Sequence, residues 1–289
     1  MVRVQHFFDQ ATFTLSYILF DEVSREAVIL DPVLDYEPWG SQVSTRSVAE
    51  LVNFIKTEGL KVKLILETHA HADHLSGSQE IKRVFPEAKL AIGRRISEVQ
   101  AIFKKVYNLP AEFPTDGRQF DRLLHDGERV ELGSLSFQVL FTPGHTPACA
   151  SYVFEDKVFT GDALFMPDYG TGRCDFPGGS AAVLFESITR KLYTLPEQTK
   201  VYTGHDYMPN GRELRFQSTI GEQKAHNIQL SASTRLDEYV QFRETRDKKL
   251  DAPKLLHQSV QVNIDAGHLP QAEDNGLSYL KMPLFLSKI

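Results

Sequence analysis

Short apolar runs alternate with amphipathic stretches along the first two hundred residues of the chain. The runs end in turn-forming residues, which is typical of β-strands. Between them, apolar residues recur every three to four positions, which predicts helices with one buried face. The expected strands are 2–8, 12–20, 27–30, 63–67, 90–92, 129–132, 136–141, 151–154, 157–160 and 200–203, and the expected helices are 47–58, 79–85, 96–107, 181–192 and 234–249. This order predicts an α+β protein that contains βαβ units.

The pattern changes after residue 210. The stretch 234–249 predicts a strongly charged helix, and the last 25 residues are irregular. The inner face of that helix is expected to carry Leu236, Tyr239, Val240 and Arg243. No Gly/Ser-rich linker separates the two parts. We therefore expect a catalytic domain over 1–210, with the helices and tail of 211–289 packed on it as an appendage.

Four of the predicted strands end in side chains that can bind a metal. The strand 63–67 is followed by Thr-His-Ala-His-Ala-Asp-His at 68–74, and three others by Gly144-His145, Gly161-Asp162 and Gly204-His205. Glycine allows a tight turn and a close approach at a strand end. Neutral imidazoles and carboxylates suit Zn, Fe or Mn, so a metal site is the first hypothesis. A polar surface turn that is rich in histidine is the alternative.

Composition narrows the class of protein. The formal net charge of −6 and the lack of a basic tract argue against nucleic-acid binding. The only two cysteines, Cys149 and Cys174, exclude a disulfide scaffold and a Cys-rich zinc site. Residues 1–9 have no signal-like apolar core, and no apolar stretch approaches the length of a membrane span. We expect a soluble, cytoplasmic protein that does not bind membranes.

The order of the strand-end residues resembles the metallo-β-lactamase superfamily. The matching stretches are 68–74, 144–146, 161–163 and 204–206, and the resemblance covers roughly 2–210. It implies an αββα sandwich, in which two sheets lie between outer helices and metals bind at one edge of the sheets. Residues 162–180 resemble the persulfide dioxygenase branch, also called sulfur dioxygenases. Stretches within 261–276 resemble bacterial members of this group that are called β-lactamase-like hydrolases.

The persulfide dioxygenase resemblance implies a non-haem iron enzyme and a homodimer. Its reaction would oxidise glutathione persulfide with O2 and water to sulfite and glutathione. One Fe(II) per chain would be held by the catalytic residues His69, His145 and Asp162. Hydrolase members fill a second site with the equivalents of Asp73, His74 and His205, with His71 completing the first. Since all four are present here, the ligands alone do not exclude two metals; we expect these four to lie beside the iron or at an unfilled second site.

Glutathione carries two carboxylates, so an acidic protein needs a local cationic pocket for it. Arg173 is the first candidate, because an Arg fork binds a carboxylate through two hydrogen bonds. Lys281 is a weaker candidate, and Tyr169 and Tyr207 are expected to hydrogen-bond the peptide. Cys174, beside Arg173, is expected to be a packed thiol.

Other functions stay open at this point. A dinuclear zinc hydrolase that resembles glyoxalase II would cleave a glutathione thioester. A lactonase would act without glutathione, and a metal-binding sensor would have no activity. A nuclease of this fold would need a basic groove, which the sequence does not provide.

Overall fold

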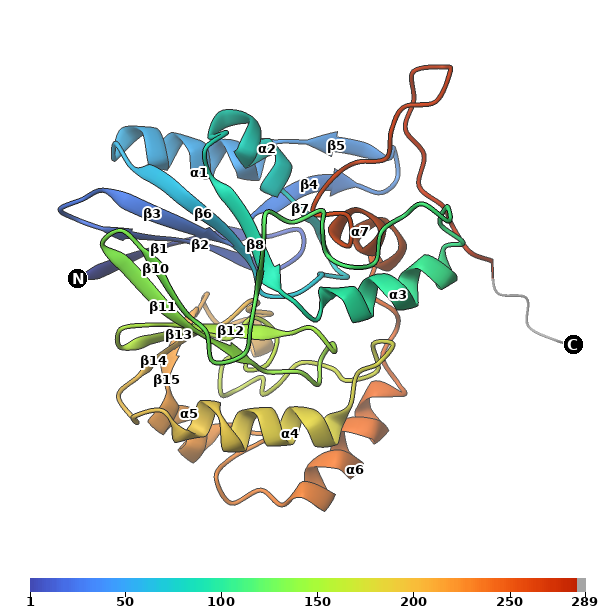
Figure 1. Cartoon of the computed structure of the whole chain (residues 1–289). Coiled ribbons are helices and arrows are strands. Elements are labelled where there is room, and N and C mark those ends of the chain that lie inside the picture. The colour runs from blue at the N-terminus through green and yellow to red at the C-terminus, as the bar shows by residue number, and fades with distance from the viewer. Residues whose placement is uncertain (285–289) are drawn as a thin grey trace, which may run out of the picture.

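Two six-stranded sheets face each other in the computed structural model, which describes residues 1–284 (Figure 1). The strand order of the first sheet is β1 (Val2–Asp9), β2 (Thr14–Asp21), β3 (Glu26–Leu30), β6 (Lys61–Glu67), β8 (Lys89–Gly93) and β9 (Arg122–Leu124). The second sheet consists of β10 (Arg129–Leu132), β11 (Leu135–Phe141), β12 (Ala150–Phe154), β13 (Lys157–Phe159), β14 (Lys200–Tyr202) and β15 (Gln217–Thr219). A small third sheet joins β5 (Gln42–Ser44), β4 (Val33–Glu37) and β7 (Leu75–Ser76).

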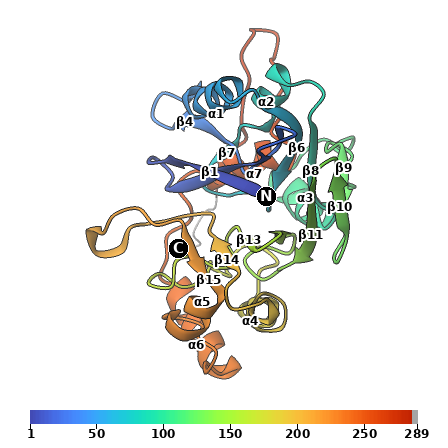
Figure 2. The same cartoon turned by 90° about the vertical axis from the view of Figure 1, so that its left-hand side faces the viewer.

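Helices cover the outer face of each sheet, as both views show (Figures 1 and 2). Four of them share an apolar core with the first sheet: α1 (Arg46–Thr57), α2 (Ser78–Val84), α3 (Ile96–Val106) and α7 (Leu256–Asn263). Three share a core with the second sheet: α4 (Ala181–Arg190), α5 (Ile220–His226) and α6 (Leu236–Asp247). Two short 3₁₀ turns, η1 (Leu192–Thr194) and η2 (Pro209–Gly211), complete the regular elements of the described chain.

Strand β2 explains how one strand serves two cores. Its side chains alternate between the faces of the sheet, because successive residues of a strand point in opposite directions. Leu15, Tyr17 and Leu19 lie between the two sheets, whereas Ile18 and Phe20 pack toward the helices. All five are buried, which is why the strand is a nearly continuous apolar run. Each fully buried side chain of this kind contributes about 1.5–3 kcal/mol.

The α+β sandwich expected from the sequence is confirmed. Strands β3 and β6 are parallel and flank α1, so the predicted βαβ unit is also present. The sequence pattern missed the elements that are short or polar, which are β4, β5, β7, β9, β15, α5 and α7. Leu236 was expected on the inner face of α6, but it is exposed, and the buried positions of that helix are Tyr239, Arg243 and Asp247.

The boundary predicted at residue 210 stays a prediction. Residues on both sides of it share cores, since Leu255, Val260 and Ile264 pack in the apolar cluster of the first sheet. Within residues 1–284, no helix has both the length and the apolar character needed to cross a bilayer.

Candidate metal centre

Seven side chains that can bind a metal meet where the loops after several strands converge. Four of them lie on the turn between β6 and β7, and the others follow β11, β13 and β14. They are His69, His71, Asp73, His74, His145, Asp162 and His205. Backbone hydrogen bonds tie the two sheets together at this edge: Leu15 N donates to Gly204 O (2.8 Å) and Ala150 N donates to Thr68 O (2.9 Å). The seven side chains are therefore held by loops of both sheets.

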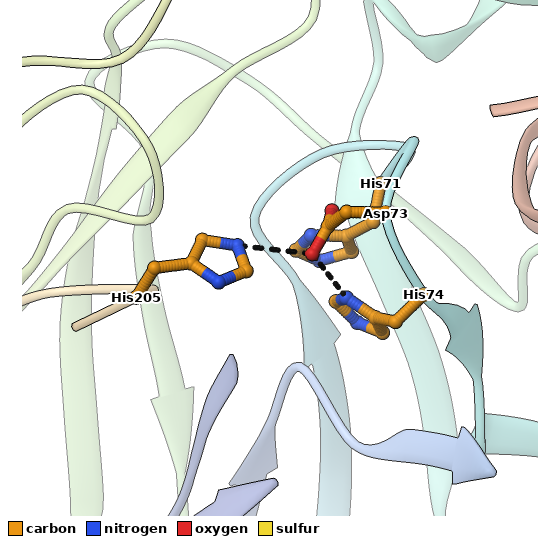
Figure 3. Close-up of side chains that lie close together, drawn as sticks. All are labelled: His71, Asp73, His74 and His205. Carbon is orange, nitrogen blue, oxygen red and sulfur yellow. Dashed lines mark hydrogen bonds and ion pairs between the residues drawn. The ribbon is translucent and has the colours of Figure 1, made fainter. Parts of the chain in front are cut away.

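The ligand atoms of these seven side chains fall into two neighbouring groups, and His71 also belongs to a third group with Asp31 and Glu67. One group consists of His69, His145 and Asp162, and the other of His71, Asp73, His74 and His205; within each group all ligand atoms lie within 4.8 Å of one another. In the second group, Asp73 Oδ2 lies 3.3 Å from both His74 Nδ1 and His205 Nε2 (Figure 3). In the first, Asp162 Oδ2 lies 3.4 Å from His145 Nε2 and 3.9 Å from His69 Nε2.

Several of these atoms are buried without a hydrogen-bond partner in the described chain. They include the Nε2 atoms of His69, His74 and His205 and the Oδ1 atom of Asp162. Buried polar atoms are nearly always hydrogen-bonded, so a cluster of buried lone pairs without a partner is a suitable place for a bound cation. The residues present thus fit a metal ion, and imidazole with carboxylate suits Fe, Zn or Mn.

Backbone carbonyls orient two of the histidines. His145 Nδ1 lies 2.7 Å from the carbonyl oxygen of Arg173, and His205 Nδ1 lies 3.1 Å from that of Phe13. A carbonyl oxygen only accepts hydrogen bonds, so Nδ1 carries the proton and Nε2 offers its lone pair to a metal. Burial, together with nearby His71 and His145, holds the pKa of His69 well below its usual value, which keeps the His69 imidazole neutral.

His71 contacts two buried carboxylates that the sequence pattern did not single out. Its Nε2 atom lies 3.1 Å from Asp31 Oδ1 and 3.6 Å from Glu67 Oε2. Burial by itself lowers the pKa of His71, but the carboxylates of Asp31 and Glu67 outweigh burial and raise that pKa well above its usual value. Asp31 directly follows β3, as the other candidates follow their strands, and this position was the signal in the sequence that could have singled it out.

A pocket of about 760 Å³ opens over the metal centre. Asp73, His145 and Asp162 lie at its wall, together with Tyr169, Arg173 and Tyr207. Burial, with the carboxylates of Asp162 and Asp73 nearby, raises the pKa of Tyr207 well above its usual value. The Tyr207 hydroxyl therefore keeps its proton, and it makes no hydrogen bond to another described residue, so it is free to donate one to a bound molecule.

The cations that line this pocket differ in how strongly they are already paired. Arg173 holds Asp175 through two hydrogen bonds (2.6 and 2.7 Å) and also donates to the carbonyl oxygen of Asp251. Arg46 pairs with Asp35 at 2.9 Å. By contrast, Arg246 lies over the ring of Tyr169, and neither Arg246 nor Lys254 has an ion pair in the described chain.

The structure does not bring Lys281 to the pocket. Its ammonium donates to the carbonyl oxygen of Asn108 at 2.7 Å, and Lys281 is absent from the described residues that line the cavity. No sequence pattern pointed to Arg46, Arg246 and Lys254, because nothing local distinguishes them from solvated surface cations.

Both cysteines are buried and free. Burial raises the pKa of Cys174 to about 12 and that of Cys149 to about 12, so both are thiols at neutral pH. This agrees with the packed thiol that was expected at Cys174.

Comparisons with known proteins identify the protein family to which the chain belongs. Residues 12–205 match the family model described as "Metallo-beta-lactamase superfamily". The chain therefore belongs to the metallo-β-lactamase superfamily, as the order of the strand-end residues predicted.

Two relatives and one solved structure cover most of the chain. "Glyoxylase B2" of Dictyostelium discoideum is 49% identical over 283 residues, which are 98% of this chain and 97% of that protein. Mitochondrial "Persulfide dioxygenase ETHE1" of Homo sapiens is 31% identical over 268 residues, which are 92% of this chain and 89% of that protein. The crystal structure of ETHE1 from Myxococcus xanthus has a TM-score of 0.73 and 32% identity, and the match covers 92% of this chain and 100% of that one. The family is thus shown, and its named members include both a dioxygenase and a glyoxylase.

Proposed function

We propose that the chain is a persulfide dioxygenase that holds one Fe(II) at His69, His145 and Asp162. The observation that carries the proposal is the grouping of these three ligands, with His71 turned toward Asp31 and Glu67. Two histidines and one carboxylate form the triad that is typical of non-haem iron oxygenases. A ferrous ion held by His69, His145 and Asp162 would supply the redox chemistry and would bind O2 and a sulfur ligand.

The protein residues bind and orient the substrate, which we propose to be glutathione persulfide. Arg246 and Lys254, which have no ion pair within residues 1–284, are suited to its carboxylates, since charge-assisted hydrogen bonds are roughly twice as strong as neutral ones. Arg173 borders the same space, although Asp175 already occupies one side of its guanidinium. The Tyr207 hydroxyl is a donor for a peptide carbonyl.

Aromatic side chains form part of the pocket wall beside the ligand candidate His205. Phe165, Tyr169 and Tyr207 pack against one another with ring centroids 4.7–5.9 Å apart, and all three line the cavity. The overall reaction would convert glutathione persulfide, O2 and water to glutathione and sulfite. The relationship to persulfide dioxygenase ETHE1 supports this assignment.

A dinuclear zinc glutathione-thioester hydrolase is the second candidate. The complete group His71, Asp73, His74 and His205 favours it, and so does the 49% identity to a protein named glyoxylase. A cationic pocket for a glutathione derivative suits both candidates, so the metal and the reaction must separate them.

The decisive experiment combines metal analysis with oxygen uptake. Chain purified from iron-supplemented and from zinc-supplemented cultures is assayed for metal content, for O2 consumption with glutathione persulfide, and for hydrolysis of S-lactoylglutathione. We expect about one iron per chain and persulfide-dependent O2 uptake with release of sulfite. Two zinc ions per chain with thioester hydrolysis and no O2 uptake would establish the hydrolase instead. The homodimer and the cytoplasmic location stay predictions.

A further inference from the structure

The loop that follows Asp162 lacks regular secondary structure, yet it carries a contact to a metal-ligand candidate. Residues 167–180 contain no helix or strand. Within this loop the carbonyl oxygen of Arg173 accepts the hydrogen bond from His145 Nδ1 at 2.7 Å. The direction of the His145 ring therefore depends on where the backbone of Arg173 lies.

Side chains from the C-terminal part of the chain bind the backbone of this loop on both sides of Arg173. Gln229 donates to Tyr169 O (2.7 Å) and accepts from Thr171 N (3.1 Å), and Asn227 donates to Gly170 O (3.2 Å). From α6, Arg243 donates to Thr171 O (3.2 Å), and Asp247 accepts from Cys174 N (2.8 Å). These contacts replace the backbone ladder that a helix or strand would provide.

Arg243 and Asp247 are the two charged residues among the side chains that bind this loop. They lie four residues apart on α6, on the same face of the helix, and their side chains form an ion pair. Arg243 is 0% exposed and Asp247 is 4% exposed. Arg243 also donates to Gln229 Oε1 at 2.8 Å, which couples the pair to the other contacts of the loop. A buried ion pair of this kind has few alternative arrangements, because moving either partner leaves an unpaired charge.

The structure assigns Arg243 and Asp247 as positioning residues for the metal ligand His145. The pair fixes Thr171 and Cys174, and the backbone between them places the Arg173 carbonyl. That carbonyl turns Nε2 of His145 toward Asp162, the other ligand candidate of its group. Neither side chain touches the metal site itself. Outer partners of metal-bound histidines typically change metal affinity by about 10- to 100-fold when they are lost.

This inference rests only on the metal-binding part of the proposed function, and not on the persulfide reaction. Cobalt(II) is therefore the probe, because its visible absorption reports both the affinity and the ligand geometry of the site without any turnover. The test variant is Asp247→Asn, which keeps the size of the side chain and removes its charge. The matched control is Asp237→Asn on the same helix, where the aspartate is exposed and pairs with Arg235.

A double variant keeps the test informative if Asp247→Asn does not fold. Arg243→Met with Asp247→Leu removes both buried charges together, a replacement that is often neutral or stabilising, while it also removes the acceptor for Cys174 N. We expect both test proteins to bind cobalt(II) about 10- to 100-fold more weakly than the unchanged chain and with an altered absorption spectrum. The control should keep the affinity and the spectrum. A folded double variant with unchanged affinity and spectrum would overturn the assignment, whatever the single variant does.

Discussion

Asp162 Oδ1 lies 3.5 Å from Nε2 of His205, although the two residues belong to different ligand groups. The other carboxylate oxygen of Asp162 faces His145 at 3.4 Å. Asp162 thus lies between the two groups, within reach of a histidine of each. Variants of His205 and Asp162 therefore test whether one metal ion or two bind here.

We expect His205→Asn to keep about one iron per chain and Asp162→Asn to lose it, because only Asp162 belongs to the proposed iron triad. Metal analysis of the two purified variants beside the unchanged chain measures this difference. Loss of all metal from both variants would contradict a single-ion centre, since it would mean that the two groups bind as one unit.

We expect Arg246→Met and Lys254→Met each to raise the KM for glutathione persulfide about tenfold, while kcat changes little. The physical reason is the loss of one charge-assisted contact to a carboxylate that is present before and during the reaction. Steady-state O2 uptake measures both constants.

The control for the Arg246 and Lys254 variants is Lys281→Met, which removes a cation that lies outside the pocket. We expect its KM to stay unchanged. A rise in KM for the Lys281 variant alone would instead support the substrate contact that the sequence suggested for that residue.

We expect neither cysteine of the folded chain to react with Ellman's reagent at pH 8. Burial raises the pKa of each thiol to about 12, so the reactive thiolate is rare at that pH, and reactivity should increase only as the pH approaches that value. Both thiols should react once the chain is unfolded in guanidinium chloride. Fast reaction of one thiol in the folded chain would show an accessible cysteine, and Cys174→Ser would identify which one it is.

We expect Gly172→Ala to lower the free energy of unfolding by about 3 kcal/mol. A Cβ atom at this position would lie 2.1 Å from the carbonyl oxygen of Asp162, a backbone atom that cannot move without shifting the ligand. The variant should also lose metal. Urea unfolding and metal analysis test the two effects.

Gly127→Ala is the control that separates the steric clash expected at Gly172 from the effect of backbone strain. Gly127 has a φ of +77°, but a Cβ atom at this position would meet no other atom within 4 Å, so its replacement should cost only about 1 kcal/mol. Equal unfolding midpoints for the two glycine variants would argue against a steric role for Gly172.

Local pattern was sufficient for the α+β class and for the set of metal-ligand candidates, whereas the αββα sandwich was expected from the family resemblance that the order of those candidates carries. Strand β2 and helix α1 bury one or both faces with a regular period, and such periods are visible in a single sequence. The candidates His69, His145, Asp162 and His205 follow strands that could be recognised from that pattern. Short elements such as β4 and polar ones such as α7 were missed, because too few apolar positions mark their period.

Only the tertiary structure decided how these residues are grouped and what surrounds them. His71 meets Asp31 across two parallel strands, and Lys254 reaches the same pocket as Asp73, although 181 positions separate them in the sequence. On α6, Arg243 and Asp247 look like ordinary members of a charged helix until the loop that they hold is placed beside them. A sequence shows which side of its own element a residue occupies, because that depends on local geometry. Which elements meet depends on packing between distant segments. That packing decided how the ligands are grouped, which cations line the pocket and which residues support His145.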